Sequence, residues 1–149
     1  MKKLMTAAVA AMVLAAPAFA GGHAAWKSVG DESLIAFGSV KKAVVGEVHT
    51  FGDVSGTVSE GGDVAIAIQL ASVETNIDIR NERMIEHVFK GMDAVANLTG
   101  SVDMDDVNDL AVGATTVTDF EGTLSLAGVS SDIETELFVA RLSEDRVLV

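Results

Sequence analysis

The chain alternates between apolar and polar residues over much of its length, which is the pattern of β-strands with one buried face. Residues 64–70 alternate strictly, with bulky aliphatic side chains on one side and smaller ones on the other. Residues 117–126 alternate in the same way, and there the opposite side is polar or acidic. Successive side chains of a strand point to opposite faces, so we expect the apolar side of residues 117–126 to point inward. These inward positions are Thr118, Phe120, Gly122, Leu124 and Leu126. In residues 64–70 both sides are mostly apolar, which suits a strand that is packed on one side and lines a cavity, or is covered, on the other. The bulky side of this strand consists of Val64, Ile66, Ile68 and Leu70.

Other segments rich in β-branched residues predict further strands. Gly46, Gly52 and Gly56 interrupt this part of the chain, and a glycine within a strand often marks a bulge or bend. Gly61-Gly62 predicts a tight hairpin, because glycine accepts the positive φ angles of such turns. A second turn is expected at residues 127–132. The additional strands are expected at residues 33–40, 44–51, 53–59, 98–104 and 133–142.

Residues 76–91 break the alternation and predict one short amphipathic helix. Asn76 or Asp78 is suited to cap its start, and Gly91 its end. The solvent-facing side carries Arg80, Glu82, Arg83 and Glu86. Local salt bridges are the expected arrangement there, and the alternative is that Arg80 or Arg83 faces a ligand head group. Apolar residues recur at positions i, i+1, i+4 and i+5 of this helix and form a stripe that could close one end of a barrel. The stripe consists of Met84, Ile85, Val88 and Phe89.

Together these segments predict about seven or eight short antiparallel strands and one helix, which is an all-β sandwich or barrel. Periodicity does not decide between the two architectures. The length after residue 20 suits a single domain. Residues 146–149 look like the start of another strand, so we expect the sequence to be truncated at this end.

Residues 1–20 have the layout of a secretory signal peptide. Lys2 and Lys3 precede an apolar run over residues 4–14, and small residues at Ala18-Phe19-Ala20 provide a cleavage site. The run is too short to span a hydrocarbon core of about 30 Å as a helix. We therefore expect cleavage near Ala20 and a periplasmic or secreted domain over residues 21–149.

The composition is acidic and free of cysteine. The formal net charge is −12, and loss of Lys2 and Lys3 would make it more negative, which disfavours nucleic acid and anionic membrane surfaces as partners. The absence of cysteine excludes disulfides, catalytic thiols and cysteine-ligated metals. With one tryptophan and no tyrosine, the apolar content is mainly aliphatic, so stability must come from packing.

Two short motifs and the opening strands carry a family resemblance. Residues 71–76 read ASVETN and are followed by Arg80, and residues 122–129 read GTLSLAGV. In order and spacing they resemble the YceI-like family of lipid- and polyisoprenoid-binding proteins. In that family Ser-hydrophobic-x-Thr precedes an Arg-containing helix, and a G-x-L-x-hydrophobic-x-G-V hairpin follows. Residues 33–40 and 46–56 are similar to the family's opening strands.

The resemblance implies an antiparallel lipocalin-like β-barrel whose interior holds an amphiphilic isoprenoid, such as a quinone or a polyprenyl species. It covers residues 26–142. Two departures stand out: residues 92–97 lack a proline that relatives commonly have after the helix, and residues 130–132 replace a turn of the Lys-Pro type. Relatives also continue beyond this point to complete the barrel wall, so this chain would present an open edge.

Residues with catalytic or metal-binding chemistry form no recognisable set in the sequence. His49 and His87 lack an H-x-H or H-E-x-x-H arrangement, and we expect both at the surface or on the side of the helix. No G-x-S-x-G nucleophile elbow is present. Residues 103–109 (DMDDVND) lack the glycine and distal glutamate of an EF-hand loop, which favours a solvated turn over a calcium site. The sequence therefore favours a protein that is not an enzyme and requires no cofactor.

One conditional metal site remains at the expected mature terminus. Cleavage after Ala20 would expose Gly21-Gly22-His23, whose amine, amide nitrogens and imidazole can surround Cu(II) or Ni(II) in a square plane. A tail with an incidental histidine is the favoured alternative.

We expect the protein to carry or sequester a long-chain isoprenoid in an apolar barrel cavity, since burial contributes about 0.8 kcal/mol per CH₂. The alternatives are a structural or stress-related interaction protein with a self-filled barrel and, less favoured, a hydrolase of lipid-like substrates. The sequence leaves the oligomeric state open, a dimer included. The expected ligand-contacting residues, each of which could equally belong to an ordinary core, are Phe37, Val48, Ile66, Ile68, Leu70, Met84, Val88, Phe89, Phe120, Leu124 and Leu126.

Overall fold

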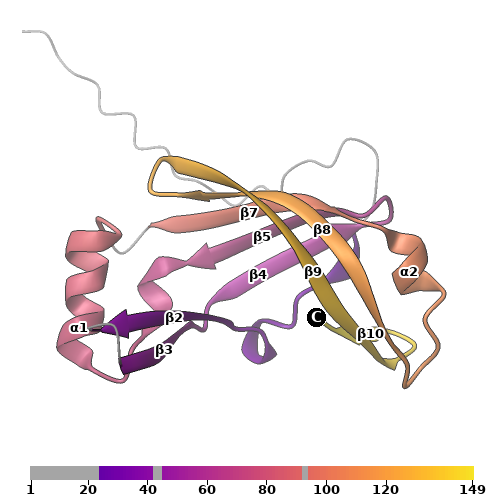
Figure 1. Cartoon of the computed structure of the whole chain (residues 1–149), viewed down its shortest axis with the longest axis horizontal. Helices are drawn as coiled ribbons and strands as arrows, with labels where there is room; N and C mark the ends of the chain where they lie inside the picture. Colours follow the sequence, from indigo (N-terminus) through magenta and orange to yellow (C-terminus); the bar gives the residue numbers. More distant parts are fainter. Residues whose placement is uncertain (1–23, 42–44, 92–93) are drawn as a thin grey trace, which may run out of the picture.

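Most of the alternating segments form antiparallel strands in the computed structural model, which describes residues 24–41, 45–91 and 94–149 (Figure 1). The strands are β1 (Ala24–Lys27), β2 (Ile35–Lys41), β3 (Val45–Phe51), β4 (Val54–Ser59), β5 (Asp63–Gln69), β6 (Val73–Glu74), β7 (Val95–Val102), β8 (Thr115–Leu126), β9 (Val129–Ser143) and β10 (Arg146–Leu148). The helical segments are 3₁₀ turns at Gly30–Glu32 and Leu70–Ser72, α1 (Asp78–Arg83), a π-helical segment at Met84–Val88 and α2 (Met104–Asn108). The expected all-β class is confirmed.

The strands form one large curled sheet and one small sheet. The large sheet has seven strands in the order β1-β4-β5-β7-β8-β9-β10, and the small sheet has three in the order β2-β3-β6. Neighbouring strands pair antiparallel throughout both sheets. Figure 1 shows the small sheet and α1 at one end of the curled sheet, with α2 and β10 at the other. The curled sheet is a half-barrel whose edge strands are β1 and β10, in agreement with the barrel-like prediction.

Two strand boundaries differ from the sequence prediction. β1 covers residues 24–27, for which no strand was predicted, and residues 129–132, expected in a turn, belong to β9. The turn between β8 and β9 is only Ala127-Gly128, with φ angles of 51° and 82°. A two-residue hairpin turn whose twist matches that of its flanking strands requires a positive φ angle at both turn residues. β10 confirms the strand expected near residue 146.

Of the three glycines expected to mark bulges or bends, Gly46 and Gly56 lie in regular register, and Gly52 lies in the connection between β3 and β4. Gly46 pairs with Val40, and Gly56 pairs with Ile66 without a shift. The register shifts lie instead at the two edge strands of the large sheet. The Gly61-Gly62 hairpin is confirmed, and at φ 90° a Cβ on Gly62 would lie 2.1 Å from the carbonyl oxygen of Val102.

The helix is shorter than expected and changes type along its length. α1 gives way to a π-helical segment, in which the amide of Phe89 donates to the carbonyl of Met84 at 2.9 Å. The predicted caps are wrong at the start, because Ile77 holds the N-cap position and no side chain caps it. At the end, Lys90 already has a positive φ of 63°, and the amide of Gly91 donates to the carbonyl of Ile85 at 2.9 Å.

The acidic segment at residues 103–109 is a short helix rather than the expected solvated turn. Asp103 caps α2 by accepting a hydrogen bond from the amide of Asp105 at 2.9 Å. Met104 and Val107 are buried, so this helix covers an apolar region with its carboxylates outside. The apolar positions within the acidic segment decide its conformation.

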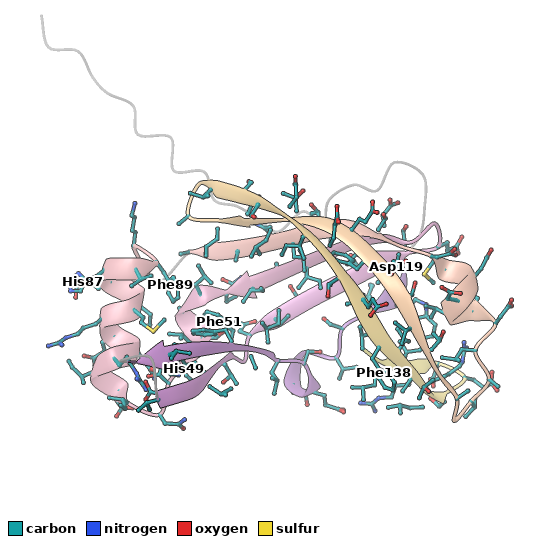
Figure 2. The ribbon with its side chains drawn as sticks, in the orientation of Figure 1. His49, Phe51, His87, Phe89, Asp119 and Phe138 are labelled. Atoms are coloured by element: carbon teal, nitrogen blue, oxygen red, sulfur yellow. The ribbon has the colours of Figure 1, made fainter. Side chains whose placement is uncertain are left out.

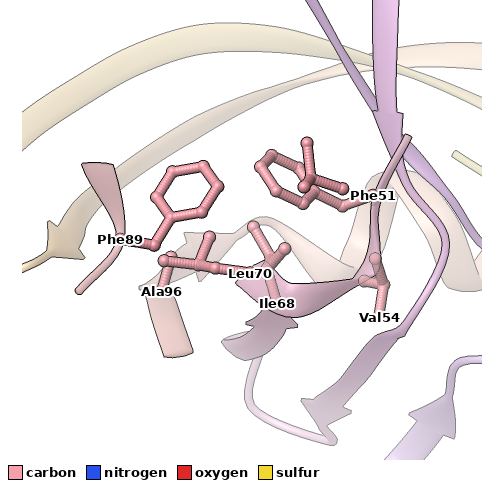
Figure 3. Packing of buried hydrophobic residues seen from close by; sticks show 7 residues of the cluster. Phe51, Val54, Ile68, Leu70, Phe89 and Ala96 are labelled. Carbon is pink, nitrogen blue, oxygen red and sulfur yellow. The ribbon is translucent and has the colours of Figure 1, made fainter. Parts of the chain in front are cut away.

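Buried side chains form two clusters at opposite ends of the half-barrel. The inner cluster lies between the large sheet, the small sheet and the π-helical segment, as Figure 3 shows. The far cluster lies under α2 and includes Val139, with Trp26 and Val147 packed against it. The inner cluster consists of Phe51, Val54, Ile68, Leu70, Val73, Phe89 and Ala96.

Side chains near the two edges of the half-barrel contact one another at its far end. The guanidinium of Arg141 on β9 lies 5.7 Å from the ring centroid of Trp26 on β1, and Arg146 on β10 pairs with Glu32. The described residues contain no helix long and apolar enough to cross a membrane.

Candidate functional site

Most of the predicted ligand-contacting residues gather on the concave side of the half-barrel. Ile68, Leu70 and Phe89 belong to the inner cluster itself. Five more pack against this cluster and are only partly buried. These five are Phe37, Ile66, Met84, Leu124 and Leu126.

A row of aliphatic side chains in the middle of the concave face stays partly accessible. Ile66 on β5 pairs in register with Leu98 on β7, which in turn pairs with Leu124 on β8. All three are of intermediate burial, although they lie on the central strands of the sheet. We call Ile66, Leu98 and Leu124 the central row. Leu98 was not among the predicted contacts, because β7 shows weaker alternation in the sequence.

Phe120 also points to the inner face, and its ring lies over Gly100 and Gly122. It is 3% exposed, and a Cβ added to Gly100 or Gly122 would lie 2.7 or 2.6 Å from its Cζ atom. Gly100 and Gly122 pair directly across β7 and β8. The two glycines therefore leave the space that the Phe120 ring occupies, and its inward direction is confirmed.

The inward orientation expected for Val48 and Val88 is wrong. Val48 is 69% exposed because the neighbours at alternate positions on β3, His49 and Phe51, point inward. Val88 is 56% exposed because the wider turn of the π-helical segment directs Met84 and Phe89 inward instead.

Aromatic rings line the end of the concave face near the small sheet. The Phe37 and Phe51 ring centroids are 5.1 Å apart and nearly parallel, and Phe51 lies 5.8 Å from Phe89. Figure 2 shows Phe51 and Phe89 directed toward each other, with His87 on the outer side of the helix. The rings from β2, β3 and the helical segment thus form a continuous apolar wall.

His49 is buried, which contradicts the surface position expected for it. It is 4% exposed, its Nε2 lies 3.0 Å from the Ser39 hydroxyl, and its ring centroid is 5.1 Å from that of Phe37. The sequence contained a signal for this, since His49 stands two residues before Phe51 on an alternating strand. His87 is exposed, as expected.

Arg80 joins the helix to the small sheet instead of making the expected local helix salt bridges. It donates to Glu47 on β3 at 2.9 Å and to the backbone carbonyl of Thr75 at 2.7 Å. Thr75 is 2% exposed, and Asn81 Oδ1 accepts from both its amide and its hydroxyl. The ASVETN segment and Arg80 therefore fasten the helix across the end of the small sheet.

Glu74 completes this connection from the solvent side. It accepts hydrogen bonds from the amide of Asn76 and from the side-chain amide of Asn81. These bonds, the first of them most strongly, hold the pKa of Glu74 below its ordinary value of 4.5. Asn76 has a φ of 59°, a left-handed conformation that asparagine tolerates better than most residues.

Two open hollows are found away from the central row. One of about 270 Å³ follows the carboxylate-rich ribbon of β8 and β9. The other, about 360 Å³, lies along the helix and is lined by Ile79, Arg80, Arg83, Met84, His87 and Val88. Neither is an enclosed tunnel along the inner face. In the described part of the chain, the expected apolar interior is thus an accessible wall.

The described residues bring together no group of three or more His, Cys, Asp or Glu side chains that could hold a metal ion. The Gly21-Gly22-His23 segment lies outside the described residues, as does the expected signal peptide. What the described site offers is apolar contact area, with a few polar groups at one end.

Two comparisons with known proteins, one with family models and one with solved structures, find the same kind of domain. The family model described as YceI-like domain matches residues 26–146. A solved structure of a polyisoprenoid binding domain from Saccharophagus degradans, implicated in plant cell wall breakdown, is 40% identical in sequence, with a TM-score of 0.78. That match covers 84% of this chain and 72% of the other. No curated protein sequence matches.

Proposed function

This chain belongs to the YceI-like domain family, and from that premise we propose that it binds and carries a long-chain isoprenoid lipid of the polyprenyl or quinone type. The solved relative is a polyisoprenoid binding domain, and it shares 40% of its residues with this chain over the match. The proposed role is non-covalent carriage or sequestration, without catalysis or a required cofactor.

The observation that carries the proposal is the central row of Ile66, Leu98 and Leu124. Aliphatic side chains in the middle of a sheet's concave face remain partly accessible, which leaves apolar area for a guest to cover. An isoprenoid chain laid along this row would gain about 0.8 kcal/mol for each CH₂ removed from water. The aromatic wall of Phe37, Phe51 and Phe89 extends the same surface.

We further propose that the protein acts in the periplasm or after secretion. Support comes from the sequence of residues 1–20, with two lysines, an apolar run and an Ala-x-Ala site. The high acidity of the chain suits a carrier that remains in solution.

The test is organic extraction of natively purified full-length protein, followed by mass spectrometry. We expect about one prenyl lipid per protein molecule. Leu124→Gln should lose most of this lipid, because a buried amide without a partner costs about 1–3 kcal/mol. The matched control is Val117→Gln on the outer face of the same strand, where the side chain is 52% exposed, and it should retain the lipid.

Other outcomes of this extraction point to the alternative functions. Protein that is repeatedly empty, from several growth conditions, would favour the interaction protein with a self-filled interior. A lipid that is recovered chemically altered, with the change abolished by replacing one polar residue, would favour a hydrolase.

A further inference from the structure

His49 has a buried nitrogen that nothing in the described structure satisfies. The residue is 4% exposed, its Nε2 is within hydrogen-bond distance of Ser39 Oγ, and its Nδ1 is buried without a partner. A buried polar atom left without a hydrogen bond is costly, so native structures rarely keep one without a reason. Such an atom on the inner face of a binding fold is suited to meet a polar group of the guest.

The inner face of the small sheet changes steadily from apolar to polar. Along this face, three successive pairs of residues lie opposite each other on β2 and β3. These pairs are Ile35 with Phe51, Phe37 with His49, and Ser39 with Glu47. The first pair joins the inner cluster, while Glu47 reaches Arg80 at the other end of the series. His49 therefore stands where the apolar wall stops. An amphiphile lying on this wall would bring its polar end to this position.

The charges near His49 are already balanced. Arg80 and Glu47 form an ion pair at 2.9 Å, each with about 30% of its side chain exposed (29% and 30%). Arg80 Nε is itself buried without a partner, so a second unsatisfied donor lies at the same end. A diphosphate here would meet the Glu47 carboxylate and an arginine whose charge is already neutralised.

We propose that His49 binds the polar end of the guest through Nδ1 and selects isoprenoids that end in an uncharged oxygen, a hydroxyl or a carbonyl. The Ser39 hydroxyl can donate to Nε2, which would place the ring proton on Nδ1 as a donor to that oxygen. This inference rests on the proposed function, because it assigns the head-group contact within the same site.

The test compares three probes by equilibrium dialysis: geranylgeraniol, geranylgeranyl diphosphate and the corresponding hydrocarbon without a head group. The natural protein should bind the alcohol about tenfold more tightly than the hydrocarbon, which is the effect of one buried hydrogen bond. It should bind the diphosphate more weakly than the alcohol. His49→Leu should abolish the preference for the alcohol and leave hydrocarbon binding nearly unchanged.

Two further variants separate recognition from structure. His49→Asn keeps a polar atom near the Nδ1 position and should retain part of the preference, while His87→Leu removes an exposed histidine and should change nothing. The inference is overturned if His49→Leu keeps the preference, as it would if only water satisfied Nδ1, or if the diphosphate binds best. Failure of the natural protein to bind any of the three probes would instead contradict the proposed function itself.

Discussion

A single exposed carboxylate holds the loop that positions the helix. Glu74 accepts hydrogen bonds from Asn76 and Asn81, and Asn81 in turn accepts from the buried Thr75. Because these bonds favour the charged form, they lower the pKa of Glu74 in the folded protein. Ionised Glu74 therefore stabilises the fold, and this contribution depends on pH.

The sign of that dependence follows from linkage. A lowered folded pKa gives stability that is present above the ordinary value of 4.5 and is lost as the pH falls through the lowered value. We expect Glu74→Gln to reduce the melting temperature slightly at pH 7, and the difference from the natural protein to vanish in acid once the pH lies below the lowered pKa of Glu74. Thermal denaturation followed by circular dichroism measures this.

The charge-matched control for this measurement is Glu60→Gln in the β4–β5 turn. If both variants follow the same pH curve, the loss reflects net charge rather than the hydrogen bonds of Glu74.

Sequence reasoning at the residue scale succeeded where one face of a strand is clearly bulkier. It placed Ile68 and Phe120 inward, and both are buried. It failed for Val48 and His49, which were assigned by side-chain type rather than by position on the strand. The hydrogen bond from Arg80 to Glu47 could not be predicted, because it joins residues 33 positions apart.

At the scale of elements, the β8–β9 ribbon places like charges opposite each other. Asp119 pairs with Glu136, and Glu121 pairs with Glu134, all on the exposed face. Figure 2 shows Asp119 and Phe138 on this ribbon. Like charges directly across an antiparallel pair repel each other and weaken the pairing. The ribbon is therefore less stable than its length suggests.

Replacing one of these carboxylates should stabilise the protein. We expect Glu136→Lys to raise the free energy of unfolding by about 0.5–1 kcal/mol, because it turns a repulsive cross-strand pair into an attractive one. Urea denaturation measures the change, and high salt should reduce it.

Glu144→Lys, in the turn before β10, changes the net charge equally without a cross-strand partner in the ribbon. An equal gain in that variant would assign the effect to overall charge and contradict the role of the pairs.

The helix shows why element boundaries were harder to predict than the elements. The stripe of Met84, Ile85, Val88 and Phe89 was interpreted with α-helical spacing, whereas the chain adopts a π-helical turn there. Phe89 belongs to the inner cluster and Met84 packs against it, and this packing outweighs the α-helical spacing that the sequence pattern indicates. The acidic segment at α2 shows the same effect, since burial of Met104 and Val107 makes it helical.

At the scale of the whole molecule, the sequence predicted the class of fold but not its arrangement. Alternation and turn signals gave the antiparallel strands, and the family motifs indicated a barrel-like sheet. The division into a seven-stranded half-barrel and a separate small sheet depends on pairings between distant strands, such as β1 with β4. The contact of Trp26 with Arg141 likewise has no local signal.

The concave wall of the half-barrel is the proposed binding surface for an isoprenoid. Methyl-labelled protein titrated with geranylgeraniol and followed by NMR tests this most directly. We predict that the methyl signals of Ile66, Leu98 and Leu124 shift with saturation at one equivalent, while those of the outward-facing Val48 and Val117 stay in place. Shifts confined to Val48, Val88 and Val117, or no saturable shift at the central row, would contradict it.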